Sequence, residues 1–447
     1  MMSILQVILA LLICVTAYRV EASPTIPGPA RLVASDGTIR SPWIDDHRNT
    51  VVDGGTTRYF ADDGSDACGS CTSMSCPCQS LSKMYSVRQS RDNILFKRGD
   101  SWVGTLQLQF SPNGTSSDYT TYGVWGTASD PRPMFEGNGA TQNMRARSYI
   151  WVDRLYFTDH SVIRVQELSH HITFSYVVNR DNRHTCFAID QRPNGAGVPH
   201  HVTIANSNIG RCGVSALPCA GTTNGHEGIY ISSSTRVGFG AEDIQVYNTR
   251  IWGTTKEPIN IKEESERITF RGNLIEDVAM CDDVGMIAFN FTSLERILVF
   301  DNIIRNVFKH TGGADVFVMG PNGRVYNNLV YNIGQNVNLL SITSMAQGTT
   351  EVLHNTFFNW EESIFGSMRH DSANNNNILN NIGPGTLPQN INSSSGLFIN
   401  PSAGDFRLSE GSAAVDRYSN CQGVARDFQG DIRPINNRCD AGADEQR

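Results

Sequence analysis

The chain has 447 residues, of which 39% are hydrophobic, and a formal net charge of −8 at pH 7. A chain of this length can bury a sizeable core, and its acidic balance gives no sign of nucleic acid as a partner. An acidic protein also repels an acidic polymer overall, so a site for a polyanion would have to be locally basic or hold a cation.

The chain begins with the apolar run "ILQVILALLICVTA", followed by "YRVEA". This pattern is typical of a secretion signal over residues 1–22 and is short for a membrane span. No later apolar run approaches membrane-spanning length, so we expect a secreted, extracellular monomer without a membrane partner. Three sequons fit this route and predict glycosylation at Asn113, Asn290 and Asn392.

Removing the signal takes Cys14 with it and leaves ten of the eleven cysteines. An even number in a secreted chain favours disulfides. The cluster Cys68, Cys71, Cys76 and Cys78 also has the spacing of a zinc knuckle, but disulfides that hold a loop-rich start are the simpler interpretation.

Short segments rich in β-branched and aromatic residues recur along the chain, with Gly, Asn and Ser between them. Aligned on one position, they are 22, 30, 42, 24, 29, 26, 27 and 26 residues apart, at Leu155, Val177, Ser207, Thr249, Asn273, Asn302, Asn328, Asn355 and Asn381. A repeat of about 25 residues without helical periodicity predicts a β-solenoid. No leucine frame recurs, which excludes a leucine-rich repeat, and propeller blades need about 40 residues.

Equivalent residues of a solenoid stack at about 4.8 Å, so the asparagines of this series are expected to hydrogen-bond along the axis. Two apolar columns are expected to face inward: Ile229, Ile259, Ile287, Val316 and Leu340, and Ile231, Ile261, Phe289, Val318 and Ile342. The 42-residue step contains a long loop, and we expect Cys212 and Cys219 to close it.

The segments "YFADDGSD…PCQSLSK", "GLFINPSAGDFRLSEGSAAVD" and "DFQGDIRP…CDAGADE" resemble the opening and closing segments of secreted right-handed parallel β-helix proteins, the pectin-lyase-like superfamily. The resemblance covers roughly residues 59–447. It implies an all-β chain with one right-handed parallel β-helix over residues 59–396 and a C-terminal cap over 397–447, after a leader over 23–58. We expect Cys421 and Cys439 to close the cap. One fold hosts several chemistries, so this likeness does not fix the activity.

Strand alternation places Asn260, Lys262 and Glu264 on the outward face, because Ile259 and Ile261 point inward. The resemblance implies that a polysaccharide lies on this outward sheet. We therefore take Lys262 and Glu264 as candidate catalytic residues. The candidate substrate-binding residues are Tyr230, Asn260 and Phe317; the two aromatic rings could stack on sugars, although exposed aromatic residues are also ordinary.

Lyases of this fold use a lysine or arginine to remove the proton α to a uronate carboxylate. That proton is weakly acidic until the carboxylate is neutralised, so the site needs a cation on the acid and a base beneath the carbon. Glu257, Glu263 and Glu264 favour the charged form of Lys262 unless a bound metal ion neutralises these carboxylates. The alternative is a salt-bridged surface lysine.

Glu227 and Glu257 each lie two residues before an inward isoleucine, in the same column of adjacent coils. Asp282 and Asp283 begin the next coil near the same edge. Four stacked carboxylates repel unless they are protonated or share a cation, and hard oxygen ligands favour Ca²⁺. The alternative is a solvated turn.

The pattern "EPINIK…FRG…CDDVG" resembles a calcium-dependent pectate lyase family, which implies Glu257, Asp282 and Asp283 as metal ligands. Val284 interrupts that pattern. An alginate-lyase-type pair of Lys262 with Arg369 is excluded, because four coils separate them by about 19 Å. The pairs His170-His171 and His200-His201 stack at one coil position, as metal ligands or as ordinary turn residues.

The leading hypothesis is a secreted lyase acting on an acidic, uronate-containing polysaccharide, with calcium as a candidate cofactor. The second is a glycoside hydrolase that uses paired acids such as Asp282 and Asp283, or Glu257. The third is a carbohydrate-binding or extracellular-matrix protein without enzymatic activity.

Overall fold

The computed structural model describes residues 43, 48–52, 54–190, 197–214, 226–232, 240–262, 265–278, 287–289, 297–307, 314–319, 322–334, 337–342, 349–360, 377–379, 381–383 and 390–446. The predicted secretion signal lies outside these residues. Among them, no helix is both long and apolar enough to cross a membrane.

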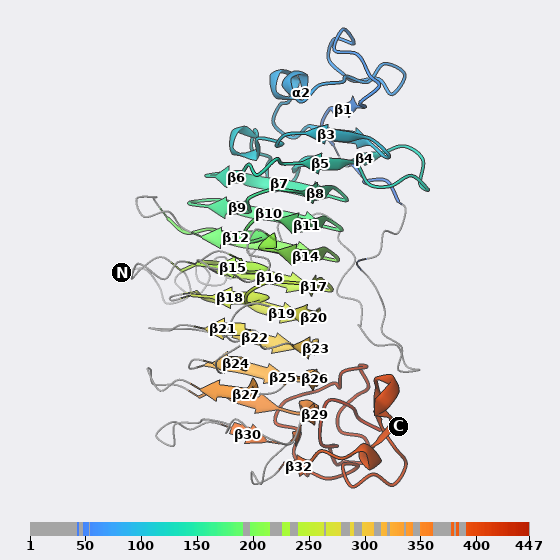
Figure 1. The fold of residues 1–447 in the computed structure, drawn as a ribbon, viewed down its shortest axis with the longest axis vertical. Helices are drawn as coiled ribbons and strands as arrows, with labels where there is room; N and C mark the ends of the chain where they lie inside the picture. Colours follow the sequence, from blue (N-terminus) through green and yellow to red (C-terminus); the bar gives the residue numbers. More distant parts are fainter. Residues whose placement is uncertain are drawn as a thin grey trace, which may run out of the picture.

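The described chain winds into a single parallel β-helix, whose coils stack along the long axis of the molecule (Figure 1). Each complete coil contributes one strand to each of three parallel sheets, which confirms the predicted fold class. Sheet 1 contains β1 (Thr57–Phe60), β2 (Asn93–Lys97), β4 (Thr120–Trp125), β7 (Ser148–Asp153), β10 (His170–Ser175), β13 (His200–Ala205), β16 (Glu242–Tyr247), β19 (Thr269–Arg271), β22 (Ile297–Phe300), β25 (Gly323–Tyr326), β28 (Glu351–Leu353) and β30 (Asn377–Leu379).

Sheet 2 runs beside it. It contains β3 (Ser101–Val103), β5 (Met134–Glu136), β8 (Tyr156–Thr158), β11 (Val178–Asn182), β14 (Asn208–Cys212), β17 (Arg250–Trp252), β20 (Leu274–Val278), β23 (Ile303–Val307), β26 (Leu329–Ile333), β29 (Thr356–Trp360), β31 (Ile382–Gly383) and β32 (Ile391–Asn392).

Sheet 3 carries the candidate site and runs down the left of Figure 1. Its strands are β6 (Gln142–Arg145), β9 (Ile163–Gln166), β12 (Phe187–Asp190), β15 (Ile229–Ile231), β18 (Ile259–Ile261) and β21 (Ile287–Phe289), and β24 (Ala314–Met319) pairs with β27 (Val337–Ile342) further along. The described helices are short: α2 (Leu81–Val87) and the 3₁₀ turns η1 (Leu108–Phe110), η3 (Ser395–Leu397) and η4 (Pro401–Ala403).

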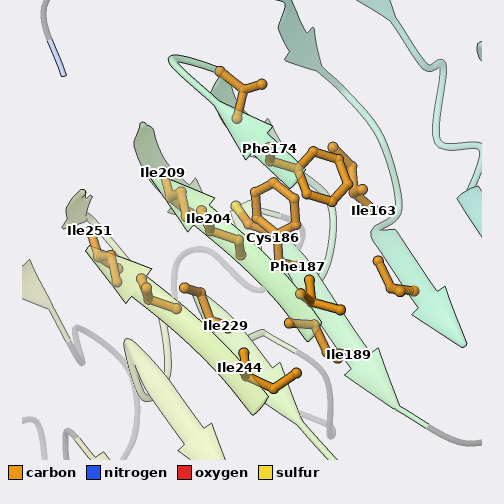
Figure 2. Packing of buried hydrophobic residues seen from close by; sticks show 14 of the residues in the cluster. Ile163, Phe174, Cys186, Phe187, Ile189, Ile204, Ile209, Ile229, Ile244 and Ile251 are labelled. Carbon is orange, nitrogen blue, oxygen red and sulfur yellow. The ribbon is translucent and has the colours of Figure 1, made fainter. Parts of the chain in front are cut away.

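The coil interior is filled by apolar side chains from all three sheets. Figure 2 shows Phe174, Phe187, Ile204, Ile229 and Ile251 pointing toward one another from successive coils. All five are fully buried. Because each coil alone would expose its apolar face, the stacking of neighbouring coils is what removes that surface from water.

The two predicted inward columns are confirmed in part. Ile229, Ile259 and Ile287 are in register, as are Ile231, Ile261 and Phe289. Beyond β21 the predicted register is wrong by one residue. Leu340 pairs with Phe317 and Ile342 with Met319, whereas the sequence paired them with Val316 and Val318.

The predicted asparagine column is present as a ladder. Each asparagine side chain accepts hydrogen bonds from the backbone N–H and the side-chain amide of its predecessor: Asn273 donates to Asn302, Asn302 to Asn328, Asn328 to Asn355 and Asn355 to Asn381, at 2.8–3.1 Å. Asn390 continues the ladder after Asn381. These bonds satisfy buried polar groups at the corner between sheets 1 and 2.

The C-terminal segment forms a cap against the last coils of sheet 2 (Figure 1). It includes the antiparallel pair β33 (Phe398–Asn400) and β34 (Asp405–Leu408). Phe406 and Phe428 of the cap pack against Tyr331 and Phe358 of the β-helix in one apolar cluster. The cap therefore covers apolar side chains on the outer surface of sheet 2.

Four disulfides join described cysteines: Cys68–Cys76, Cys71–Cys78, Cys186–Cys212 and Cys421–Cys439. The last is the predicted bond in the cap. The predicted Cys212–Cys219 bond is wrong, since Cys212 bonds to Cys186. Both side chains are fully buried and their Cα atoms lie 5.4 Å apart, so the bond joins adjacent coils and not the two ends of the loop.

Candidate functional site

The outward positions of sheet 3 form two rows of mostly polar and charged side chains. One row consists of Asn143, Arg164, Ala188, Tyr230 and Asn260, which pair in register. The second consists of Arg145, Gln166 and Asp190, and Ser232 and Lys262 follow at the matching positions after β15 and β18. Neighbouring strands are about 4.8 Å apart, so successive side chains of each row follow one another at about this spacing along the axis of the β-helix.

Glu227 and Glu257 lie at equivalent positions of adjacent coils, just before β15 and β18. The backbone N–H of Gly228 donates to the carbonyl of Glu257 at 3.0 Å, and Ile229 is in register with Ile259. Both glutamates are buried, with 5% and 4% of their surface exposed. The hydroxyl of Thr185, from the preceding coil, donates to Glu227 Oε2 at 2.6 Å.

Burial raises the pKa of Glu257 to about 7, and the neighbouring charge of Glu227 contributes to this shift. The ammonium groups of Lys262 and Lys256 oppose it. A carboxyl in this position is partly protonated near neutral pH. The pair as it stands therefore resists holding two negative charges.

Lys262 ends the outward row beside this acid pair. Its backbone N–H donates to the carbonyl of Ile231 at 2.9 Å, which extends the pairing of β15 with β18 by one residue. Its side chain is partly exposed. Its ammonium charge opposes the upward shift in the pKa of Glu257, five residues earlier in the chain.

Two predicted sugar-binding residues are not exposed, as the sequence predicted them to be. Asn260 is buried, and its side-chain amide turns back to donate to Glu257 Oε1 at 3.1 Å, because a buried carboxyl oxygen needs a donor. Phe317 is fully buried in the core cluster. Val316, its neighbour on β24, is fully buried as well, so strand alternation does not decide which of the two side chains leaves water. Tyr230 is partly exposed, as predicted.

Several candidate residues lie outside the described part of the chain: Glu264, Asp282, Asp283, Asn290 and Cys219. Of the other predicted glycosylation positions, Asn113 and Asn392 are exposed.

No protein-family model matches the chain, and no curated protein matches it. Similar solved structures do exist. The pectate lyase Pel9A is 15% identical with a TM-score of 0.56, and the match covers 89% of this chain and 98% of that one. A rhamnogalacturonan lyase is 14% identical with a TM-score of 0.54, over 86% and 96% of the two chains. The GH136 lacto-N-biosidase from Eubacterium ramulus is 14% identical with a TM-score of 0.51, over 68% and 64%.

The chain has the parallel β-helix fold of polysaccharide lyases. At these identities the likeness concerns the fold alone. It confirms the predicted parallel β-helix fold, and the chemistry of this β-helix has to be argued from its own residues.

The donor chemistry of the acid pair fits a hard cation. Glu227 and Glu257 supply carboxylates, and Thr185 supplies a hydroxyl oxygen. The Oδ1 of Asn260 is buried and accepts no hydrogen bond from the described residues. Ca²⁺ prefers oxygen ligands of these kinds, and its charge would relieve the repulsion within the pair.

A different acidic group meets a simple metal-site geometry in the described residues. Asp62, Asp63 and Asp100 bring their oxygens within 4.8 Å of one another. Lys97 already contacts Asp63 at 2.9 Å, and the backbone N–H of Asp62 donates to Asp100. The cluster is partly neutralised by Lys97, and acidic groups of this kind are common without an ion, so we assign no site to it.

Sequence reasoning missed the first half of the outward face of this β-helix. Arg145, Arg164, Gln166 and Asp190 lie on β6, β9 and β12, upstream of the first strand assigned to this sheet. Gln166 donates to Asp190 at 3.0 Å, and Arg164 lies 3.5 Å from the same carboxylate. The alternation in "VIRVQ" and "FAID" was the available signal.

Proposed function

We propose that this protein is a secreted polysaccharide lyase that cleaves a uronate-containing polymer by β-elimination on the outward face of sheet 3. The observation that supports this most is the buried pair of Glu227 and Glu257, with the charge of Lys262 acting on Glu257. The four disulfides and the predicted signal support an extracellular location.

In the proposed reaction Lys262 first gives up its own proton to solvent, and its neutral amine then accepts the proton α to the uronate carboxylate. The electron pair of that C–H bond forms a carbon–carbon double bond, and the bond to the glycosidic oxygen breaks. That oxygen leaves with a proton, which the surrounding solvent or an acid supplies. The products are a new reducing end and an unsaturated uronate.

Neutralisation of the uronate carboxylate must accompany proton removal. The protonated form of Glu257 can donate a hydrogen bond to it, and Asn260 holds Glu257 in place. A bound Ca²⁺ would supply the same neutralisation as a Lewis acid. Glu227 and Glu257 would hold the ion, and we propose Asp282 and Asp283 as further ligands. Glu264 is proposed as a second catalytic residue beside Lys262.

The rest of the face suits an acidic polymer. Arg145 and Arg164 place positive charge on strands upstream of Lys262, where further uronates of the chain would lie. Tyr230, partly exposed between these arginines and Lys262, offers a ring for stacking on a sugar. Both arginines lie near acids, Arg145 at 4.0 Å from Glu167 and Arg164 at 3.5 Å from Asp190, so a polyuronate would have to compete with these carboxylates for them.

A glycoside hydrolase is the second candidate, and the acid pair itself favours it. Two carboxyl groups, one of them with its pKa raised by burial, form the usual acid and nucleophile of such enzymes. Adjacent coils are about 4.8 Å apart, close to the carboxyl separation of retaining glycosidases. The hydrolase would act without Lys262.

The products separate these proposals. The purified protein is incubated with polygalacturonate, alginate and a glucuronate-containing glycosaminoglycan, each with added Ca²⁺ or with chelator. A lyase raises ultraviolet absorbance and reducing ends in equal amounts. Reducing ends without absorbance would establish the hydrolase instead. If neither appears, and the protein retards a polysaccharide in a gel, both catalytic proposals are wrong and the protein is a binder.

A further inference from the structure

A ladder of histidines lies at the corner where the chain passes from sheet 3 to sheet 1. His170 of β10 is in register with His200 of β13, and their rings stack with centroids 5.0 Å apart and planes 5° apart. His171 and His201 stack in the same way, at 4.6 Å and 17°. Nothing in the proposed reaction uses these four rings.

Backbone conformation brings the two histidines of each pair together. Successive side chains of a strand normally point to opposite faces. His171 and His201 have positive φ angles of 54° and 53°, as do Tyr149 and Asp243 at the same position of the flanking coils. This turn directs each pair of adjacent imidazoles toward the same region of space.

The result is the same short nitrogen–nitrogen contact in both coils. The Nδ1 atoms of His170 and His171 are 2.8 Å apart, and those of His200 and His201 are also 2.8 Å apart. A metal with bonds of about 2.0 Å and cis ligands at right angles places two nitrogens about 2.8 Å apart. A tetrahedral site needs a wider separation, of about 3.3 Å.

The surroundings suit a cation. The carboxylate of Asp243 lies 3.7 Å from His201 Nδ1, and Glu242 is in register with His200. Arg267 contacts both acids and is the competing positive charge. The rings are partly exposed, so an ion can reach them.

We propose that the His170-His171 and His200-His201 ladder is a binding site for one square-planar divalent transition-metal ion, Cu²⁺ in preference to Ni²⁺. One histidine pair chelates the ion through both Nδ1 atoms, and water completes the coordination. On binding, the proton shared between the two Nδ1 atoms moves to a ring Nε2 or to water, without any change of oxidation state. Two ions in adjacent coils would repel, so one ion binds per chain.

The test compares the full chain with a variant that keeps the rings and removes the nitrogens, His171→Phe with His201→Phe. Cu²⁺ is titrated by calorimetry at neutral pH, and the bound ion is examined by electron paramagnetic resonance. We expect one ion per chain with two imidazole nitrogens in its equatorial plane. The double variant should bind at least tenfold more weakly, and Ni²⁺ should bind the wild type more weakly than Cu²⁺ does.

His184→Phe is the matched control, because this histidine is exposed, stacks on His226 and lies outside the ladder. It should leave the affinity unchanged. If the wild type binds Cu²⁺ no more tightly than the double variant, the ladder is a stack of rings and no metal site. Should the double variant fail to fold, a wild-type resonance spectrum without an imidazole pair overturns the proposal by itself.

Discussion

Glu257 combines a structural cost with a proposed functional role. Its carboxyl is buried beside Glu227, and the pKa is raised to about 7, mainly by burial and then by that neighbour. A residue chosen only for stability at this position would be neutral. A buried acid that lowers the stability of the folded chain is typical of catalytic and metal-binding groups.

We predict that Glu257→Gln makes the protein more stable at pH 8. The folded chain holds the Glu257 proton to a higher pH than the unfolded chain does, so this group's contribution to the unfolding free energy falls as pH rises from about 4.5 to about 7. The difference amounts to at most about 3 kcal/mol. Because the glutamine side chain cannot ionise, the unfolding free energy of the variant does not fall in this way as pH rises.

Denaturant unfolding of both proteins at pH 5 and pH 8, with chelator present, measures the effect. The variant should gain stability relative to the wild type only at pH 8. Parallel pH profiles would mean that Glu257 does not titrate as described. Added Ca²⁺ should stabilise the wild type more than the variant if the pair holds the ion.

At the scale of strands and coils, much of the β-helix was predictable, because stacked positions leave a repeating signature. The asparagine series and the isoleucines of β15 and β18 identified the repeat and its register. The register at β24 was not predictable, since Val316 and Phe317 are adjacent, both apolar and both buried. Cys186 precedes the long loop by a whole coil, so its bond to Cys212 depends on coil stacking that spacing alone does not reveal.

The asparagine ladder should be a large local source of stability. Asn328 makes side-chain bonds to Asn302, Asn355 and the carbonyls of Val299 and Tyr326, all in the buried corner. We predict that Asn328→Ala costs about 3 kcal/mol or more, because several buried groups lose partners at about 1–3 kcal/mol each.

Chemical denaturation measures this loss against Asn400→Ala. Asn400 is exposed and accepts one bond from the exposed Ser402, so its loss should change stability by less than about 0.5 kcal/mol. Equal effects of the two substitutions would contradict the ladder as a source of stability.

The Cys186–Cys212 bond makes a separate prediction for adjacent coils. The cysteines are 26 residues apart in sequence. Replacing both by alanine should lower stability by about 3 kcal/mol, through the loss of a cross-link in the unfolded chain. Peptide mapping without reduction checks the pairing directly, and a peptide that joins Cys212 to Cys219 would show the assignment to be wrong.

At the scale of the whole molecule, an apolar cluster packs the cap on the β-helix, and a buried charge network holds the cap itself together. Arg433 and Glu445 form an ion pair at 2.9 Å with both side chains fully buried. Arg433 also donates to the carbonyls of Asp440, Gly442 and Asp444. Burial raises the pKa of Asp444 to about 7 and also raises that of Glu445.

We predict that Arg433→Met destabilises the protein by about 3–5 kcal/mol at pH 8, because it leaves Glu445 buried without its partner. The loss should be smaller at pH 5, where the acids of the cap can take up protons. Unfolding at both pH values, with limited proteolysis to detect release of the cap, tests this. A loss that is equal or larger at pH 5 would contradict the role assigned to the buried acids.

The central claim is that Lys262 is the base of a β-elimination, and Lys262→Ala tests it most directly. The initial rate of ultraviolet absorbance is measured on whichever polyuronate the wild type cleaves, beside the control Lys97→Ala, whose lysine pairs with Asp63 away from sheet 3. Loss of a general base should lower kcat by about 10²- to 10⁴-fold, while the control keeps wild-type activity. Full lyase activity in Lys262→Ala would contradict the claim and leave Lys262 as a surface charge.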